Sequence, residues 1–489
     1  MNNYLKKIVV GTFASLLMMS PMLEADAATT KKKAANVLNP TAAVKINKLL
    51  KSTNVQTAVS IRDAKTGKIL YSYNPTKVMS TASNMKLLTA AASLKTLGEN
   101  YRFTTKLHTT GTITKAGTLN GDVYLQGQGD PTFHKSDLTV FAKRLKAKGI
   151  KKINGTVYGD GTWFDQKYLA PGINKTDSLT YYGAPVSALS ISPNGDYDTG
   201  VVVTYATGTT TGKKPKVTFS AKGHLQVVNQ ATTTKKGSSS SLSISRTYGT
   251  NKIVIKGTVA EGKVVSKWLS VDNPTKHTMT VFLDEIKKQG IKLSKTTYKL
   301  KATPKKTTLI KQDYSPKLSN ILIPFMKLSN NGIADTLTKT MGQKVYKTGT
   351  NAAGIKAIRR YTNTKNIPSA KWSFVDGSGL SSKDKVAPST MTKFLYDVQK
   401  DTYYKTYMTS LPIGGNTARM VGGTLRHRFT TTALKNRVQA KTGSINGVRT
   451  LSGYVKQKDG DQVIVSILTA NTNSTATIDA LVNTIINEK

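Results

Sequence analysis

The chain has 489 residues, of which 38% are hydrophobic, so it can bury a large core and exceeds the size of one ordinary domain. It contains no cysteine, which excludes disulfide bonds and thiol catalysis. Its 72 lysines and arginines against 26 aspartates and glutamates give a formal net charge of +46 at pH 7, which favours polyanionic partners.

The first 27 residues have the pattern of a secretory signal peptide. Lys6 and Lys7 form a basic start, Ile8–Met19 is apolar but short for a membrane span, and Ala25-Asp26-Ala27 is a small-x-small cleavage site. We therefore expect residues 1–27 to be removed and the mature protein to be secreted. An uncleaved membrane anchor is the alternative, and the proline and acidic residues before the cleavage site disfavour it.

Export narrows the choice of polyanionic partner. We expect no nucleic acid outside the cell, whereas a bacterial wall rich in anionic polymers would hold a strongly cationic protein by long-range attraction. The sequence thus favours a protein associated with anionic cell-wall polymers. A solvated basic surface with no specific partner is the alternative that composition leaves open.

The N-terminal part of the mature chain predicts a helix, a β-hairpin and a second helix. The first helix covers residues 42–50. Residues 58–62 and 69–73 lie on either side of a Lys-Thr-Gly turn, as expected of an antiparallel hairpin. From Ser83 onward, apolar residues recur at helical spacing as far as Gly98, which predicts the end of the helix.

From Tyr101 to Pro304 the chain changes to short β-like runs separated by Gly, Asn, Asp and Thr turns. Helices are predicted over 138–148 and 279–289; both contain a Thr-Val-Phe triplet, which hints at a duplicated unit. Residues 231–243, rich in Thr, Lys and Ser, are expected to form a flexible surface loop. A basic return linker is expected after Pro304. The β-like runs include 121–127, 201–205, 216–219 and 253–255.

Helical character resumes at Leu318, and strands return near the end of the chain. A strand is expected to end at Lys441. The later predicted helices cover 333–341, 390–398 and 478–486. The predicted strands cover 437–440, 450–455 and 463–469.

Ser83 and Lys86 stand three residues apart at the start of the apolar helix. Positions i and i+3 share a helix face, so the amine can reach the hydroxyl. An apolar wall would disfavour the charged form of Lys86, and a neutral amine beside a hydroxyl is a base beside a nucleophile. A serine helix cap followed by a solvated lysine has the same pattern, however. Ser382 and Lys385 repeat it in a loop with no apolar helix behind.

A second motif, Ser329-x-Asn331, can supply other parts of acyl transfer. Ser329 can relay a proton between Lys86 and the leaving amine. Asn331 can hold Lys86 and a substrate amide by hydrogen bonds. Taken alone, the Ser-x-Asn pattern is common in turns and favours a helix cap at Ser329.

The third motif is Lys441-Thr442-Gly443. Lys441 is expected to present positive charge to the substrate, and the hydroxyls of Thr442 and Ser444, on either side of Gly443, to receive a substrate carboxylate. The backbone N–H groups of Ser83 and Ser444 can form an oxyanion hole. Two other Lys-Thr-Gly triplets, one in the hairpin turn and one in a loop, show that the triplet alone carries little weight.

The order of the three motifs resembles that of penicillin-recognising serine enzymes. The string from Ser83 to Ala92 resembles the active-site helix of class C low-molecular-mass penicillin-binding proteins, which are D-alanyl-D-alanine carboxypeptidases and endopeptidases. The resemblance covers nearly the whole mature chain, and the long gap before Ser329 suits a family with inserted domains. Asn330 departs from it, since the family often has Asp there. Further similar strings are Gly127–Pro131, Ala184–Ser190, Asp376–Leu380 and Gly423–Leu425.

The resemblance implies an α/β (α+β) fold, in which a transpeptidase-like catalytic domain is formed by residues 37–100 and 305–489 and split by one or more β-rich inserted domains over 101–304. In that fold the hairpin near Ile61 and the strands near Lys441 and Val463 would share one antiparallel sheet flanked by helices. It implies a serine peptidase that hydrolyses D-Ala-D-Ala and D-Ala-containing cross-links of peptidoglycan through an acyl-enzyme. Peptidoglycan stem peptides would be its substrates, β-lactams would acylate it, and no cofactor would be needed.

Three alternatives are weaker. A class A β-lactamase shares the motifs, but it would need fast deacylation, and the large insertion argues against it. A non-catalytic wall-binding protein is disfavoured by the intact motifs. A zinc peptidase is disfavoured because the five histidines are scattered without metal-ligand spacing, so we expect no metal site.

Overall fold

The computed structural model describes residues 38–368 and 370–488, and the predicted signal segment 1–27 lies outside the described residues. Among the residues described, no helix is both long and apolar enough to cross a membrane.

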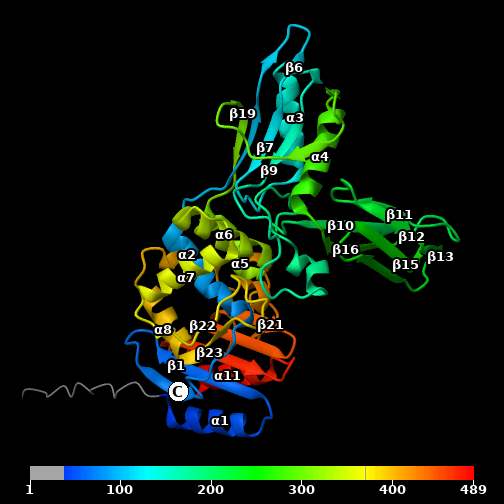
Figure 1. The fold of residues 1–489 in the computed structure, drawn as a ribbon. Helices are drawn as coiled ribbons and strands as arrows, with labels where there is room; N and C mark the ends of the chain where they lie inside the picture. Colours follow the sequence, from blue (N-terminus) through cyan, green and yellow to red (C-terminus); the bar gives the residue numbers. More distant parts are fainter. Residues whose placement is uncertain (1–37, 369, 489) are drawn as a thin grey trace, which may run out of the picture. The chain divides into compact units, whose positions relative to one another are not determined.

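A five-stranded antiparallel sheet with strand order β2-β1-β23-β22-β21 carries the catalytic part (Figure 1). The N-terminal strand β1 lies inside this sheet and pairs with β23, so that Gln56 opposes Ala470. The prediction that the hairpin and the C-terminal strands share one sheet is therefore confirmed. The strands are β1 (Gln56–Asp63), β2 (Ile69–Tyr73), β21 (Val438–Ile445), β22 (Val448–Lys456) and β23 (Gln462–Ala470).

Helices cover both faces of this sheet (Figure 1). Alternate residues of β1 serve the two faces: Val59 and Ile61 pack with α1 and α11, whereas Ala58 belongs to the core around α2. The helices of the catalytic part are α1 (Pro40–Lys51), α2 (Met85–Leu97), α5 (Leu318–Lys327), α6 (Asn331–Tyr346), α7 (Asn351–Asn363), α8 (Pro388–Val398), α9 (Tyr404–Ser410), α10 (Arg419–Gly422) and α11 (Ala476–Asn487).

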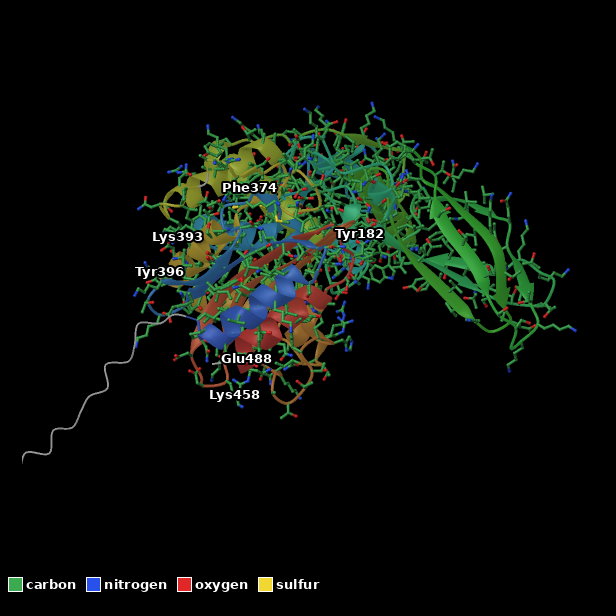
Figure 2. The ribbon with its side chains drawn as sticks, turned by 90° about the horizontal axis from the view of Figure 1, so that it is seen from below. Tyr182, Phe374, Lys393, Tyr396, Lys458 and Glu488 are labelled. Carbon is green, nitrogen blue, oxygen red and sulfur yellow. The ribbon has the colours of Figure 1, made fainter. Side chains whose placement is uncertain are left out.

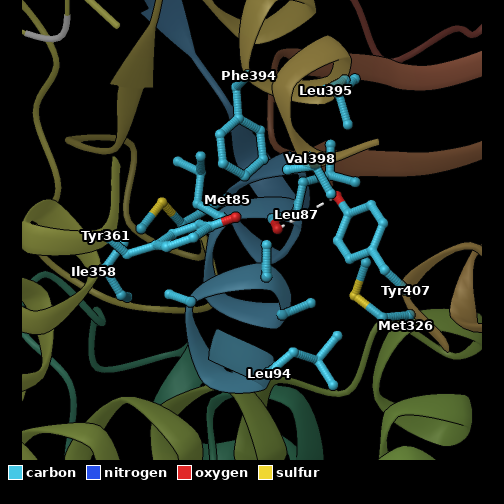
Figure 3. Packing of buried hydrophobic residues seen from close by; sticks show 14 of the residues in the cluster. Met85, Leu87, Leu94, Met326, Ile358, Tyr361, Phe394, Leu395, Val398 and Tyr407 are labelled. Atoms are coloured by element: carbon cyan, nitrogen blue, oxygen red, sulfur yellow. Dashed lines mark hydrogen bonds between the residues drawn. The ribbon is translucent and has the colours of Figure 1, made fainter. Parts of the chain in front are cut away.

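The helix α2 is the centre of the larger core. Every residue from Met85 to Leu94 is buried, and Figure 3 shows side chains of other helices, Phe394 and Tyr407 among them, around it. The helix ends at Gly98, whose φ of 84° is a left-handed value that favours glycine. The predicted apolar helix with its glycine stop is confirmed. Burial on all sides means that any polar group on its first turn is held in a dry, rigid setting.

One core of the inserted part is formed by two small sheets and two helices, α3 (Lys135–Ala147) and α4 (Pro274–Lys288). The strand orders are β18-β9-β7-β4-β19 and β17-β8-β6-β5. Because β19 pairs with β4, residues 308–314 belong to these sheets, beyond the boundary at residue 305 expected from the sequence. The strands are β4 (Thr104–Thr109), β5 (Thr112–Ile113), β6 (Thr118–Asn120), β7 (Val123–Gly127), β8 (Lys152–Ile153), β9 (Val157–Asp160), β17 (Lys292–Leu293), β18 (Tyr298–Leu300) and β19 (Thr308–Tyr314).

The shared Thr-Val-Phe triplet corresponds to a repeated topology. Each of the helices α3 and α4 is followed by two short strands, β8 and β9 after α3 and β17 and β18 after α4. The second pair adds parallel to the first, β17 to β8 and β18 to β9. Phe141 and Phe282, the last residues of the two triplets, are both buried in the common core.

The rest of the insertion consists of two further sheets around a core of their own. The predicted flexible loop 231–243 is wrong in part, because Thr232–Thr234 forms β13 and Ser241 begins β14. Thr233 is buried, and three consecutive β-branched residues suit a strand. The strands are β10 (Val201–Thr207), β11 (Lys216–Phe219), β12 (Gln226–Asn229), β13, β14 (Ser241–Arg246), β15 (Lys252–Ala260) and β16 (Val264–Ser270).

Candidate active site

A cleft of about 810 Å³ collects most of the residues predicted from the three motifs. The side chains of Ser83, Ser329 and Asn331 line it, as do Thr442 and Ser444. The two motif lysines do not line the cleft but are fully buried beneath it. Residues separated by more than 300 positions in the sequence therefore meet at one place.

Ser83 lies in a single 3₁₀ turn, η1 (Ala82–Asn84), immediately before α2. The preceding residue, Ala82, has a φ of 41°, an uncommon value for a residue with a side chain. Non-glycine residues in this region often mark sites where function constrains the backbone. The turn places the hydroxyl of Ser83 in the cleft while the helix behind it stays buried.

Lys86 sits one helical turn behind Ser83, with Nζ 2.8 Å from Ser83 Oγ. The same nitrogen lies 2.5 Å from Asn331 Oδ1 and 2.7 Å from the carbonyl oxygen of Ser378. These two oxygens accept but cannot donate, so they take both N–H bonds of a neutral amine. The lone pair is then left for the hydroxyl proton of Ser83, which is the arrangement of a base and its nucleophile.

Burial lowers the pKa of Lys86 to about 7, because the charged form is desolvated. Three buried carboxyl groups, Asp376, Asp335 and Asp384, partly offset this effect. Burial raises the pKa of Asp335 and of Asp384, and the charge of Asp376 raises both further. With its pKa lowered to about 7, Lys86 has a neutral form available near neutral pH.

Asp376 holds the loop that supplies the third partner of Lys86. Its carboxylate accepts the backbone N–H groups of Ser378 at 2.8 Å, Gly379 at 2.6 Å and Ser381 at 2.9 Å. These bonds fix the loop in which the carbonyl of Ser378 faces Lys86. The sequence marked the string Asp376–Leu380 by family resemblance but assigned it no role, since nothing local shows a backbone carbonyl pointing at a distant amine.

Ser329 is joined to the third motif. Lys441 Nζ donates to Ser329 Oγ at 2.9 Å and to the carbonyl oxygen of Thr442 at 2.7 Å. Burial, with the positive charge of Lys86 as a smaller cause, holds the pKa of Lys441 well below its usual range. Ser329 is not a helix cap, because the N-cap of α6 is Asn330, and the φ of Ser329 is 61°. The geometry thus pairs Ser329 with Lys441 and Asn331 with Lys86.

The position of the Lys-Thr-Gly motif within its strand differs from the prediction. The strand does not end at Lys441, because β21 runs from Val438 to Ile445 through the motif. Lys441 is buried, hydrogen-bonded to Ser329, and does not line the cleft, whereas Thr442 and Ser444 do. Thr442 Oγ1 also donates to Thr424 Oγ1 at 2.7 Å.

Gly443 is required by close packing. A Cβ atom there would lie 2.1 Å from Thr450 Oγ1 and 2.9 Å from the carbonyl oxygen of Thr81. The glycine therefore allows β21 to approach the turn that carries Ser83. As β21 is the edge strand of the sheet, some of its backbone groups remain free to pair with an extended ligand.

The inserted part also reaches the site. Asn331 Nδ2 donates to the carbonyl oxygen of Tyr182 at 2.8 Å. Tyr182 belongs to the short helix η3 (Tyr181–Gly183) and is labelled in Figure 2. This bond orients the Asn331 amide so that its oxygen faces Lys86. Sequence reasoning missed the contact, which joins residues 149 positions apart.

A serine nucleophile, a lysine base at the start of a buried helix and a Ser–Lys pair beside an edge strand define a penicillin-recognising serine enzyme. The chain belongs to the D-Ala-D-Ala carboxypeptidase 3 (S13) family, whose profile matches residues 42–486. The resemblance and the fold class inferred from the sequence are thereby confirmed.

Individual relatives agree with this assignment. The chain is 34% identical over 424 residues to a D-alanyl-D-alanine carboxypeptidase of Actinomadura sp. (strain R39), covering 85% of this chain and 78% of that protein. It is 27% identical to the D-alanyl-D-alanine carboxypeptidase DacB of Haemophilus influenzae, covering 81% of each. The crystal structure of penicillin binding protein 4 (dacB) from H. influenzae has the same fold, with a TM-score of 0.77 at 24% identity over 91% of this chain and 98% of that one.

Proposed function

We propose that this protein is a serine D-Ala-D-Ala carboxypeptidase of peptidoglycan that works through an acyl-enzyme on Ser83 and also cleaves D-Ala-containing cross-links. The observation that carries the proposal is the environment of Lys86. Two oxygen acceptors lie within hydrogen-bonding distance of its Nζ, which is 2.8 Å from Ser83 Oγ, so in the neutral amine the lone pair is left for the Ser83 hydroxyl.

In the first step Ser83 Oγ attacks the carbonyl carbon of the D-Ala-D-Ala bond while Lys86 takes the hydroxyl proton. The backbone N–H groups of Ser83 and Ser444 stabilise the tetrahedral oxyanion. The C–N bond then breaks, and Ser329, which is hydrogen-bonded to Lys441, relays the proton held by Lys86 to the leaving D-alanine amine, so that Lys86 is neutral again. Water completes the cycle by hydrolysing the ester on Ser83, with Lys86 as the base.

The substrate end is recognised by its carboxylate. The hydroxyls of Thr442 and Ser444 line the cleft and can receive it, and the edge strand β21 can pair with the extended stem peptide. A cross-link presents a carboxylate on the D-amino acid centre that carries the leaving amine. The same contacts therefore serve carboxypeptidase and endopeptidase action.

A β-lactam should acylate Ser83, because its strained amide mimics the D-Ala-D-Ala bond. Labelling with a fluorescent penicillin followed by mass spectrometry of the digest would locate the adduct. Ser83→Ala should abolish labelling and Ser382→Ala, in the second Ser-x-x-Lys pattern, should not. A label on Ser382, or none, would overturn the proposal. Rapid turnover of the β-lactam in place of a persistent adduct would instead favour a β-lactamase.

Export and wall association are part of the proposal. Residues 1–27 have the pattern of a cleaved signal, and the net charge of +46 favours attraction to anionic wall polymers. Cleavage after Ala27 would be tested by N-terminal sequencing of the protein recovered from cells. An intact N-terminus on the exported protein would contradict it.

A further inference from the structure

The turn that carries Ser329 is held from the inserted part of the chain. Ser329 has a φ of 61°, and a non-glycine residue persists in this strained region only where the surrounding structure holds it there. The next two residues, Asn330 and Asn331, both donate side-chain hydrogen bonds to the segment Tyr182–Asp198. The inserted segment is thus placed to impose the strained turn.

Both the oxygen and the nitrogen of the Asn330 side-chain amide form hydrogen bonds. Its oxygen accepts the backbone N–H of Ile333 at 2.9 Å and so caps α6. Its nitrogen donates to Asp198 Oδ1 at 3.0 Å and to the carbonyl oxygen of Asp196 at 2.9 Å. An aspartate would cap the helix equally well, because capping needs only an acceptor. Only an amide can also donate to the two acceptors of the inserted segment.

The same inserted segment reaches the opposite wall of the cleft. Both carboxylate oxygens of Asp196 accept from the guanidinium of Arg419, at the start of α10. Asp198 is also held by Asn194, whose Nδ2 donates to Oδ2 at 3.3 Å. All four cleft residues of this network, Asp196, Asp198, Asn330 and Arg419, line the same cavity as Ser83.

We propose that Asp198 is a positioning residue, which acts through its hydrogen bond with Asn330 to hold Ser329 and Asn331 in the geometry needed for acylation. This rests on the proposed acyl-enzyme function. The requirement is one donor at position 330 facing one acceptor at position 198. Removing either should misplace the Ser329 hydroxyl and the Asn331 amide, and an error of 1 Å costs on the order of 10²-fold in rate.

Four variants separate positioning from simple loss of stability. Asn330→Asp sets two carboxyl groups about 3 Å apart in a poorly solvated site, and its acylation at pH 8 should fall about 10²-fold. Asp198→Ala should lose about tenfold, the scale of one hydrogen bond. Asp198→Asn should keep a near-normal rate, since its amide oxygen can still accept. The exchange Asn330→Asp/Asp198→Asn should regain part of the loss, because an amide at position 198 can donate to a carboxylate at position 330, although the carbonyl oxygen of Asp196 loses its donor.

The effect of pH gives a signature that lost stability would not produce. Burial raises the pKa of Asp198 to about 6, and the charged groups facing it are Asp196 and Arg419. In Asn330→Asp the two carboxyl groups can share one proton, so the deficit relative to the wild type should shrink as pH falls from 8 to 5.5. For Asp198→Asn the ratio to the wild type should stay constant over this range.

The test is the second-order rate constant of acylation by a fluorescent penicillin, with the melting temperature of each variant measured alongside. Asp284→Asn, on α4 and outside the cleft, is the control for loss of one carboxylate. Absence of acylation in the wild type would overturn the proposed function itself. Acylation of the wild type and Asn330→Asp at equal rates, failure of the exchange variant to recover, or a deficit independent of pH would overturn only the positioning role.

Discussion

Replacing Lys86 with arginine tests the base directly. Burial lowers the pKa of Lys86 to about 7, so an unprotonated amine is available to Ser83 at neutral pH. Arginine preserves a positive charge at this position. Because it stays protonated, it cannot accept the proton of the Ser83 hydroxyl. We expect the acylation rate of Lys86→Arg to fall by about 10²-fold or more, the scale of lost general-base catalysis.

The wild-type pH profile supplies the second half of this prediction. Because the pKa is lowered, the active neutral form is present above pH 7 and is lost as pH falls. About half of the molecules would carry neutral Lys86 at pH 7 and about 1% at pH 5, so the rate should approach a tenfold fall per pH unit on the acid side. The residual rate of Lys86→Arg should lack this inflection.

Stopped-flow acylation with a fluorescent penicillin between pH 5 and 9 would measure both effects. Lys385→Arg is the matched control and should be acylated normally, since Lys385 ends the second Ser-x-x-Lys pattern and its side chain is exposed. A near-normal rate for Lys86→Arg would refute the reasoning. So would a wild-type rate without an inflection between pH 6 and 8.

Three other predictions follow from the geometry. Lys441→Ala should reduce cleavage of a D-Ala-D-Ala peptide and of its C-terminal amide by similar factors, because the buried amine contacts Ser329; a much larger loss on the free carboxylate would place Lys441 at the substrate. Gly443→Ala should lower the free energy of unfolding by about 1–3 kcal/mol and slow acylation, since its Cβ would meet Thr450 Oγ1 at 2.1 Å; unchanged denaturant unfolding would contradict this. High salt should release the protein from isolated walls, because the Debye length is about 3 Å at 1 M, and unchanged retention would indicate a non-ionic anchor.

The sequence predicts the parts of the site that depend on local periodicity. Ser83 and Lys86 face each other because three residues make nearly one helical turn, and the apolar run behind them predicts the burial that lowers the lysine pKa. The strand pairs joined by short turns, β1 with β2 and β21 with β22, follow equally from alternating strands and turns. These features need no knowledge of distant contacts.

Other features cannot be derived in this way. Lys441 lies within a strand that continues to Ile445, because pairing with β22 sustains the strand beyond the turn-prone Thr-Gly pair. The bonds of Asn331 to Tyr182 and of Asn330 to Asp198 join segments 149 and 132 residues apart. A contact between two single residues this far apart produces no periodic pattern in the sequence. Such contacts are determined by tertiary packing alone.

The position of β1 affects the order in which the protein can become active. This strand pairs along its length with β23, from Gln56 opposite Ala470 to Asp63 opposite Val463. Closing a loop of about 400 residues must precede these contacts, and non-local pairing of this kind is slow. Lys441 lies on β21, which joins the same sheet through β22. A chain still being synthesised therefore lacks both its completed sheet and its second motif lysine, so hydrolytic activity is delayed until nearly the whole polypeptide has emerged and folded.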